Sequence, residues 1–244
     1  MKYTRFFILI FIGLAAQSAR AQKITFKDEN LKQALLDGGY DRNKDGEIDV
    51  SEVEKVVKLD ITEKKIKSLD DLVWFKSLRA LYANDNDIQN LDVFFNNTVI
   101  EEIYIGRNRL GKKLILKNIE RLRTLAAFAD GLEEIELIGT DNIKVLFLQD
   151  NRFEKVGFHN LSKLADLIMS GNERLKFVDI SFNPTIGDVD LTGTAITQLD
   201  VSNNPLLKIL YVDNGVKLIK SKNQTNLTPA PVVTVQGQKK LIRH

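Results

Sequence analysis

The 244-residue sequence has no cysteine, only two histidines and no apolar stretch long enough to cross a membrane. Without cysteine, an exported protein has no disulfide framework and no lipid-attachment residue after an N-terminal apolar run. The histidines, His159 and His244, do not support a histidine-based catalytic triad or a histidine-rich zinc site. A glycine-rich phosphate-binding loop is also missing from the sequence. We therefore do not expect an enzyme.

The first 21 residues have the pattern of a secretory signal peptide. Lys2 and Arg5 precede an apolar run at residues 6–16, and Ala19, Arg20 and Ala21 form a small-x-small cleavage site. A membrane anchor is the alternative, but the run is well short of the ~20 apolar residues that a spanning helix needs. We expect cleavage after Ala21 and a location that is secreted, cell-surface or periplasmic.

Removal of the signal peptide leaves a nearly neutral chain with an uneven charge distribution. The remaining residues carry 32 lysines and arginines against 33 aspartates and glutamates. Six of the cations and none of the acids lie in residues 217–244, so residues 22–216 have a net charge of −7. Nucleic-acid binders need a broad basic surface, and this chain does not provide one. We therefore expect no nucleic-acid partner.

Apolar residues recur through the middle of the chain at intervals of 21 to 23 residues, in two interleaved series. The first series is Leu59, Leu81, Ile103, Leu125, Leu146, Leu167, Val189 and Leu210. The second is Leu69, Leu91, Leu114, Ile135, Val156, Val178 and Leu199. A fixed period in this range predicts a solenoid in which each coil packs against the next.

The first-series coils resemble the leucine-rich repeat pattern LxxLxLxxNxL. It is clearest in the segments that begin at Leu78, Ile100 and Ile143. In a short strand, alternate residues point to opposite faces, so the two flanking apolar residues enter the core and the middle residue points out. The asparagine leaves the strand, and its amide can both donate to and accept from buried backbone groups. Asp130 stands at this position in the fourth unit and keeps the acceptors without the donors.

Residues 41–52 match the twelve-residue EF-hand calcium loop at every side-chain position. The expected ligands are Asp41, Asn43, Asp45, Glu47 through its backbone carbonyl, Asp49 and Glu52. Helices are expected on both sides, at residues 28–36 and 51–58. The alternative is an acidic turn between two helices, and no second loop is present although EF-hands usually occur in pairs. We predict Ca²⁺ as a structural cofactor that stabilises the front of the solenoid.

Together these features resemble secreted bacterial leucine-rich repeat proteins of the internalin type, over about residues 24–216. The resemblance rests on the 22-residue repeats, on segments such as residues 199–214 (LDVSNNPLLKILYVDN), and on a helical EF-hand-like cap before the repeats. It implies an α/β repeat solenoid with a concave parallel β-sheet, a convex side of irregular or short-strand segments, and a helical N-terminal cap. The ligand is not implied, because such folds host many partners.

The expected organisation has four parts. The signal peptide at residues 1–21 precedes the helical cap at residues 22–58. The leucine-rich repeat solenoid covers residues 59–216. Residues 217–244 form either a C-terminal cap or a basic tail, and an alternating pattern at residues 232–242 favours a strand there.

An aromatic and aliphatic stripe occupies outward positions of the first-series strands. The expected partner-binding residues are Tyr82, Tyr104, Phe128, Phe147, Ile168 and Tyr211. Equivalent positions of stacked strands lie about 4.8 Å apart, so Tyr82 to Ile168 spans roughly 20 Å. Stripes of this kind often mark protein-binding surfaces, although strand propensity alone also places aromatic residues on exposed strand sites.

Two functional hypotheses remain open from the sequence. The first is an exported, monomeric binding module that recognises a protein on its concave face. The second is a carbohydrate-binding or cell-envelope structural protein, since aromatic stripes also stack on sugars.

Overall fold

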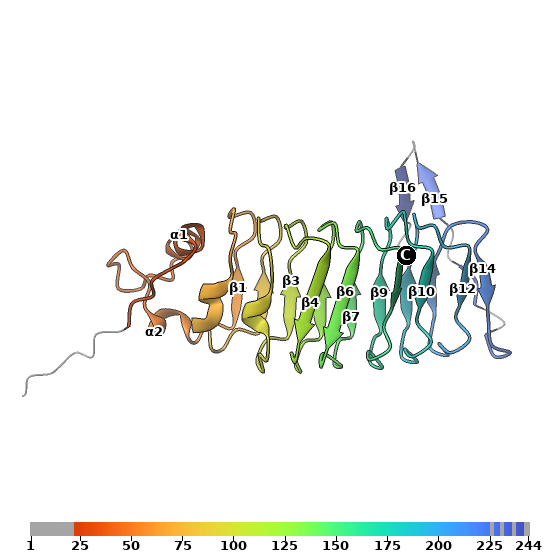
Figure 1. The fold of residues 1–244 in the computed structure, drawn as a ribbon, viewed down its shortest axis with the longest axis horizontal. Coiled ribbons are helices and arrows are strands. Elements are labelled where there is room, and N and C mark those ends of the chain that lie inside the picture. The colour runs from red at the N-terminus through yellow and green to blue at the C-terminus, as the bar shows by residue number, and fades with distance from the viewer. Residues whose placement is uncertain (1–21, 225–226, 230–231, 236–237, 242–244) are drawn as a thin grey trace, which may run out of the picture.

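The computed structural model describes residues 22–224, 227–229, 232–235 and 238–241. They form an elongated parallel β-solenoid with a small helical segment at its N-terminal end (Figure 1). The expected signal peptide lies outside the described residues. Within the described part, no helix has the length and apolar character that crossing a bilayer requires.

The first apolar series forms one eight-stranded parallel sheet, as the sequence predicts, in the order β1-β2-β3-β5-β7-β9-β11-β13. Each strand pairs with the equivalent strand of the next coil, so that Leu59 lies opposite Leu81 and Leu81 opposite Ile103. The strands are β1 (Lys58–Asp60), β2 (Ala80–Tyr82), β3 (Glu102–Tyr104), β5 (Thr124–Ala126), β7 (Val145–Phe147), β9 (Asp166–Ile168), β11 (Asp188–Asp190) and β13 (Ile209–Tyr211).

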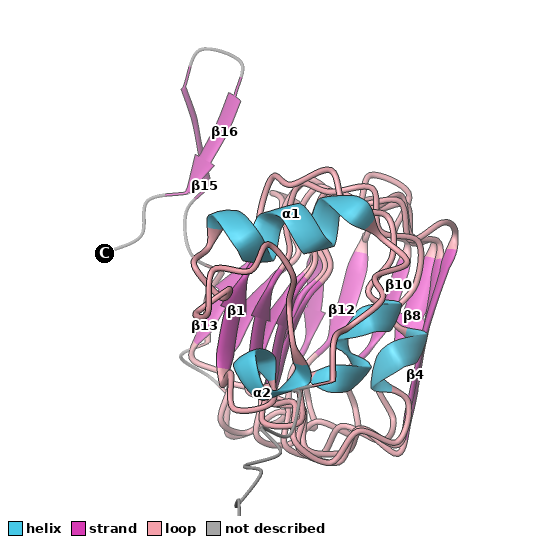
Figure 2. Ribbon diagram, turned by 90° about the vertical axis from the view of Figure 1, so that its left-hand side faces the viewer, coloured by secondary structure: helices cyan, strands magenta, loops and turns pink. Residues whose placement is uncertain are grey.

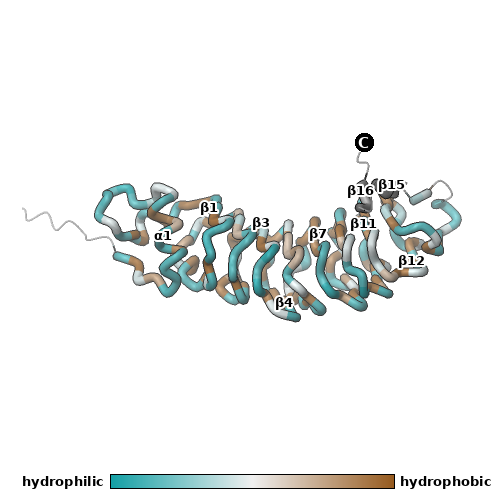
Figure 3. The backbone as a smooth tube through the Cα atoms, turned by 90° about the horizontal axis from the view of Figure 1, so that it is seen from above, coloured by the Kyte–Doolittle hydropathy of each residue, from teal (hydrophilic) through white to brown (hydrophobic). Residues whose placement is uncertain are grey.

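The second series forms the opposite wall, which changes character along the solenoid. Its first two coils carry short 3₁₀ helices, η1 (Asp70–Trp74) and η2 (Asp92–Phe94). Later coils carry parallel strand pairs: β4 (Lys113–Lys117) with β6 (Glu134–Ile138), β8 (Lys155–Gly157) with β10 (Phe177–Asp179), and β12 (Gln198–Asp200) with β14 (Lys217–Ile219). Figure 2 shows the two walls on opposite sides of the core, and Figure 3 shows the solenoid curving so that the eight-stranded sheet is concave.

Asparagines run along the concave strand ends as the repeat pattern predicts; we call Asn86, Asn108, Asp130, Asn151 and Asn172 the asparagine ladder. Asn151 shows the arrangement. Its Nδ2 donates to Leu148 O at 3.1 Å in its own coil and to Ala127 O at 2.8 Å in the preceding coil. Its Oδ1 accepts from the backbone amides of Asp130 and Leu132. Each amide therefore joins two coils where buried backbone groups would otherwise lack partners.

A second amide ladder, which the sequence did not predict, lies at the turns after the convex wall. Asn204 Nδ2 donates to Ile180 O and Asn183 O, both at 2.9 Å. Gln224 takes the same place one coil later and donates to Val201 O and Asn204 O. The sequence shows an Asn-Pro pair at two of these turns, Asn183-Pro184 and Asn204-Pro205. It does not show that the asparagine side chains would join neighbouring coils.

The coil continues past Val216, where the repeats were expected to end. Strand β14 pairs with β12, and Leu227 is buried. The remaining strands, β15 (Val232–Val235) and β16 (Gln238–Leu241), pair with each other in an antiparallel hairpin (Figure 1). Among the described residues neither strand pairs with the solenoid. The described part of residues 217–241 thus contains one more convex strand, β14, and the β15–β16 pair.

The N-terminal segment contains two helices of unequal length. Helix α1 (Glu29–Asp37) begins after Asp28, which caps it by accepting from the amides of Asn30 and Leu31, as expected. Helix α2 (Val50–Val53) has only four residues, so the expected helix at 51–58 is wrong beyond Val53. Val56 turns into the core and β1 begins at Lys58. Packing of the first coil overrides the helical pattern of this segment.

Candidate functional site

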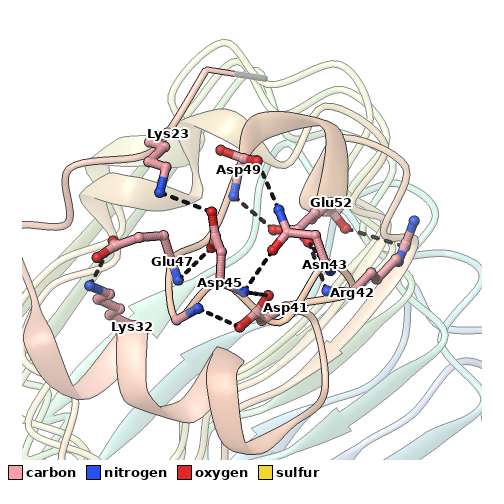
Figure 4. Close-up of polar contacts among 10 residues, drawn as sticks. Lys23, Lys32, Asp41, Arg42, Asn43, Asp45, Glu47, Asp49 and Glu52 are labelled. Atoms are coloured by element: carbon pink, nitrogen blue, oxygen red, sulfur yellow. Dashed lines mark hydrogen bonds and ion pairs between the residues drawn. The ribbon is translucent and has the colours of Figure 1, made fainter. Parts of the chain in front are cut away.

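The loop at residues 41–52 folds around its own polar side chains (Figure 4). The Asp41 carboxylate accepts from the amides of Asp45 and Gly46, at 3.2 and 2.9 Å. Asn43 Oδ1 accepts from Asp45 N, and Asp45 Oδ1 accepts from Glu47 N. Gly46 has a φ of +79°, a left-handed conformation that glycine adopts without steric cost. The chain therefore turns sharply at Gly46, the sixth residue of the loop.

Glu52 closes the loop from α2. The residue is 5% exposed, and its carboxylate accepts from Arg42 N at 2.7 Å, Asn43 N at 3.3 Å and Asp49 N at 2.9 Å. These bonds bring the last expected ligand beside the first part of the loop.

Asp49 has a buried carboxylate oxygen without a partner. The residue is 6% exposed; Oδ2 accepts from Asn43 Nδ2 at 3.4 Å, whereas Oδ1 has no hydrogen bond. An unsatisfied buried acceptor is costly, and a hard cation would satisfy it. The orphaned oxygen and the all-oxygen donor set both fit Ca²⁺.

Two lysines form ion pairs with other carboxylates of the loop. Lys23 Nζ lies 2.9 Å from Asp45 Oδ2, and Lys32 Nζ lies 2.8 Å from Glu47 Oε2. The hydrogen bond between Lys23 and Asp45 raises the pKa of the lysine and lowers the pKa of the carboxyl. In the described part of the chain, no three His, Cys, Asp or Glu side chains are grouped so that they could hold a metal ion. The loop thus has the expected order of ligands, but its carboxylates are not gathered.

A short extended segment covers the open edge of the loop. Ile24 N donates to Ile48 O and Val50 N donates to Gln22 O, both at 2.9 Å, and Lys23 forms an antiparallel bridge with Asp49. The sequence predicted neither this pairing nor the lysines, because residues 22–24 carry no motif that connects them to residues 48–50.

Two buried carboxylates join the cap to the first coil. Asp28 Oδ2 accepts from Lys67 N at 2.6 Å and Ser68 N at 2.9 Å. In return, Asp71 Oδ2 accepts from Lys27 N at 2.8 Å and Asp28 N at 3.3 Å. The helical segment is therefore fixed to the solenoid, and it covers the apolar edge of the first coil.

On the concave face, the structure brings together the first two expected partner-binding residues. The rings of Tyr82 and Tyr104 stack with centroids 4.7 Å apart and an interplanar angle of 6°. Lys58 Nζ lies 4.4 Å from the centroid of the Tyr82 ring. Both tyrosines are half-buried. Burial raises the pKa of Tyr104.

Phe128 lies against the backbone of the neighbouring coil. A Cβ atom at Gly106 would come within 2.4 Å of the Phe128 ring, so this close approach depends on glycine. The guanidinium carbon of Arg107 lies 5.2 Å from the ring centroid. Phe128 therefore packs against two consecutive residues of the preceding coil, Gly106 and Arg107.

The other three expected partner-binding residues, Phe147, Ile168 and Tyr211, line a hollow of about 350 Å³ in the concave face. The rest of its lining is Asp166, Asp188, Asp190 and Ile209. Burial raises the pKa of Asp166. The predicted stripe therefore divides into a stacked aromatic part on β2 and β3 and an apolar, acid-lined hollow on β7 to β13.

The convex wall carries exposed apolar residues that the sequence analysis did not single out. Phe177 and Phe182 are 58% and 56% exposed, and the His159 ring meets Phe182 edge-on with centroids 4.9 Å apart. The alternation around Val178 and Ile180 could have placed Phe177 outward, but it puts Phe182 on the buried side; Phe182 is exposed because β10 ends at Asp179 and a turn follows.

No protein-family model matches the sequence, and no curated protein matches it. Among solved structures, the chain is similar to the functional domain of InlJ from Listeria monocytogenes, which includes a cysteine ladder. The TM-score is 0.65 and the identity 19%, over 86% of this chain and 47% of that chain. This chain has the leucine-rich repeat fold. A second similar structure is internalin C2 (InlC2) from the same organism, with a TM-score of 0.47 and 17% identity over 83% of this chain and 91% of that chain.

The likeness to the InlJ domain concerns the fold, and this chain spans about half (47%) of the matched InlJ chain. This sequence has no cysteine, so it contains no cysteine ladder, and asparagine amides join its neighbouring coils.

Proposed function

We propose that this protein is an exported, monomeric leucine-rich repeat binding module that recognises a protein through its concave face. The observation that carries the proposal is the half-buried aromatic pair, Tyr82 and Tyr104, on the second and third strands of the eight-stranded sheet. Tyrosine contributes large contact area at low entropic cost in protein interfaces. The fold shared with the InlJ domain supports a binding role rather than catalysis.

The same geometry favours a protein over a sugar as the partner. Stacking on a sugar needs a free aromatic face. The ring of Tyr82 already stacks on Tyr104 and has the Lys58 ammonium 4.4 Å from its centroid. The ring edge remains for contact, and the hydroxyl, which donates to Glu102 Oε2 at 3.5 Å, can still accept a hydrogen bond from a partner.

Replacing Tyr82, Tyr104 and Phe147 together by alanine is expected to weaken partner binding at least about 100-fold, because buried aromatic anchors each contribute roughly 2 kcal/mol or more to an interface. The purified chain would capture the partner from envelope or host extracts, and calorimetry would then compare the variants. A glycan array run in parallel tests the carbohydrate alternative.

The matched control for that experiment is the double variant Phe177→Ala, Phe182→Ala on the convex wall. It removes comparable aromatic area and is expected to leave binding unchanged. Full binding by the triple variant, or loss of binding in the convex control alone, would contradict a concave interface.

We further infer that the loop at residues 41–52 holds a structural Ca²⁺. The orphaned oxygen of Asp49 and the EF-hand order of donors support this inference. The protein ligands would be Asp41, Asn43, Asp45, Asp49 and Glu52 through side chains and Glu47 through its carbonyl. In this role Ca²⁺ would neutralise the loop carboxylates and stabilise the cap.

Calcium is expected to raise the melting temperature of the protein. A ligand stabilises the folded state by RT ln(1 + [L]/Kd), so 1 mM Ca²⁺ at a Kd of about 10⁻⁴ to 10⁻³ M contributes about 0.4 to 1.4 kcal/mol. Differential scanning calorimetry with millimolar CaCl₂ or with EGTA measures the effect. Glu52→Gln should abolish it, whereas Glu54→Gln, a charge-matched control on the same turn, should retain it. An equal melting temperature in CaCl₂ and EGTA would rule out the site.

A further inference from the structure

Lys23 occupies a distinctive place beside the candidate calcium loop. Its ammonium lies 2.9 Å from Asp45 Oδ2, and Asp45 is the fifth residue of the twelve-residue loop. Figure 4 shows this lysine and Lys32 reaching two different loop carboxylates. One of those side chains is an expected metal ligand, and the other is not.

The backbone holds Lys23 in this position. The antiparallel bridge between Lys23 and Asp49 is flanked by two hydrogen bonds, Ile24 N to Ile48 O and Val50 N to Gln22 O. The backbone pairing therefore keeps the Lys23 ammonium within one side-chain length of the loop. Its effective concentration at Asp45 is high, and diluting the protein does not change it.

We propose that Lys23 is a built-in competitor for Ca²⁺, and that its ion pair with Asp45 sets the calcium affinity of the loop. This inference rests on the proposed calcium site. When Lys23 binds Asp45, its ammonium occupies a carboxylate oxygen of one expected ligand. Ion binding requires Asp45 to exchange the ammonium for the metal.

The consequence is a site of low affinity with a loop that is ordered without the ion. Asp45 keeps a cationic partner in either state, so the repulsion among the loop carboxylates is partly relieved before Ca²⁺ arrives. Extracellular calcium modules bind with Kd values of about 10⁻⁴ to 10⁻³ M, and we expect this loop to fall in that range. Such a site is filled outside a cell and empties at much lower calcium concentrations.

Lys32 provides a matched control within the same chain. It also carries one positive charge beside the loop and lies 2.8 Å from a carboxylate oxygen, on Glu47. Glu47 is expected to bind through its backbone carbonyl, so releasing its side chain frees no ligand. Removal of either lysine changes the net charge equally, and a difference between the two variants isolates direct competition for Asp45.

The test measures Ca²⁺ binding by isothermal titration calorimetry on the chain that starts at Gln22, without an N-terminal tag because the Gln22 carbonyl takes part in the bridge. Lys23→Gln is expected to lower the Kd for Ca²⁺ by about three- to fivefold, the range that breaking an ion pair typically allows. Lys32→Gln should change it by less than about twofold, and Lys23→Arg should bind as the unmodified protein does. Circular dichroism without calcium confirms that each variant is folded.

The outcomes separate this inference from the calcium site itself. Tighter Ca²⁺ binding in Lys23→Gln than in Lys32→Gln supports both the calcium site and the competition by Lys23. Equal Kd values in the two glutamine variants overturn the competition but leave the site in place. Absence of measurable binding at 10 mM CaCl₂ in all variants, Lys23→Gln included, overturns the calcium site and with it the role of Lys23.

Discussion

Replacing Asp130 with asparagine is expected to stabilise the protein by about 2–4 kcal/mol at pH 8. Asp130 occupies one rung of the asparagine ladder and is 8% exposed. Its Oδ1 accepts from Asn108 N at 2.6 Å, but its Oδ2 has no partner. At the equivalent place in the next coil, Asn151 donates two hydrogen bonds to backbone carbonyls. An asparagine at 130 would supply these donors and carry no charge.

The effect should depend on pH, because burial raises the pKa of Asp130 to about 7. The unfolded chain has an aspartate pKa of about 3.9. Between these values the unfolded state has released a proton that the folded state retains. The free energy of unfolding therefore falls as the pH rises from about 4 to about 7, and stays low above that range. A shift of roughly three pKa units sets an upper limit of about 4 kcal/mol.

Chemical denaturation of both proteins at pH 5 and pH 8 measures this dependence. The advantage of Asp130→Asn should be small at pH 5 and larger at pH 8. The converse variant, Asn151→Asp, places an acid in the next rung and should lose stability as the pH rises through the same window. A difference between Asp130→Asn and the unmodified protein that is the same at both pH values would show that the Asp130 carboxyl does not titrate as the structure implies.

Asp130 also illustrates why so much of this fold could be predicted from its sequence. In a solenoid, each residue contacts its equivalent one coil later, so spacing alone predicts register. The pairing of Lys58 with Ala80 and of Ala80 with Glu102 follows directly from the period. The repeat pattern also marks Asp130 as a departure from asparagine. It does not predict that Asp130 Oδ2 lacks a hydrogen-bond partner, because that depends on how the neighbouring coils pack around the carboxylate.

Apart from the second amide ladder, the contacts that sequence analysis missed are contacts that do not repeat from coil to coil. The bond between Lys23 and Asp45 depends on how one extended segment lies against a loop 22 residues away, and no periodic signal encodes it. The predicted length of α2 was wrong for a related reason. The helical spacing of apolar residues continues past Val53, but the chain leaves the helix there and Val56 packs into the core. On the concave face, spacing predicted which residues point outward. It did not predict that Phe128 would lie over Gly106, because that depends on side-chain volume between coils.

The junction between cap and solenoid is such a non-repeating contact, and Asp28→Ala is expected to destabilise the protein by about 3–5 kcal/mol. Asp28 is 8% exposed, and four backbone amides donate to its carboxylate. Two of them, at Asn30 and Leu31, belong to the first turn of α1. The other two, at Lys67 and Ser68, belong to the first coil. Alanine would leave all four without this acceptor, two of them at the docking surface.

Serine at position 28 separates the two roles of Asp28. Serine is a good helix N-cap, so Asp28→Ser should restore the bonds to α1 without reaching Lys67 and Ser68. Urea unfolding of both variants should place Asp28→Ser between alanine and the unmodified protein, with the remaining loss assigned to docking. Asp70→Ala, which removes only an exposed ion pair with Lys27, should cost less than about 1 kcal/mol. Full recovery in Asp28→Ser would show that the carboxylate only caps α1. A persistent deficit would show that it also holds the cap over the apolar edge of the first coil, where an uncovered repeat would expose its core.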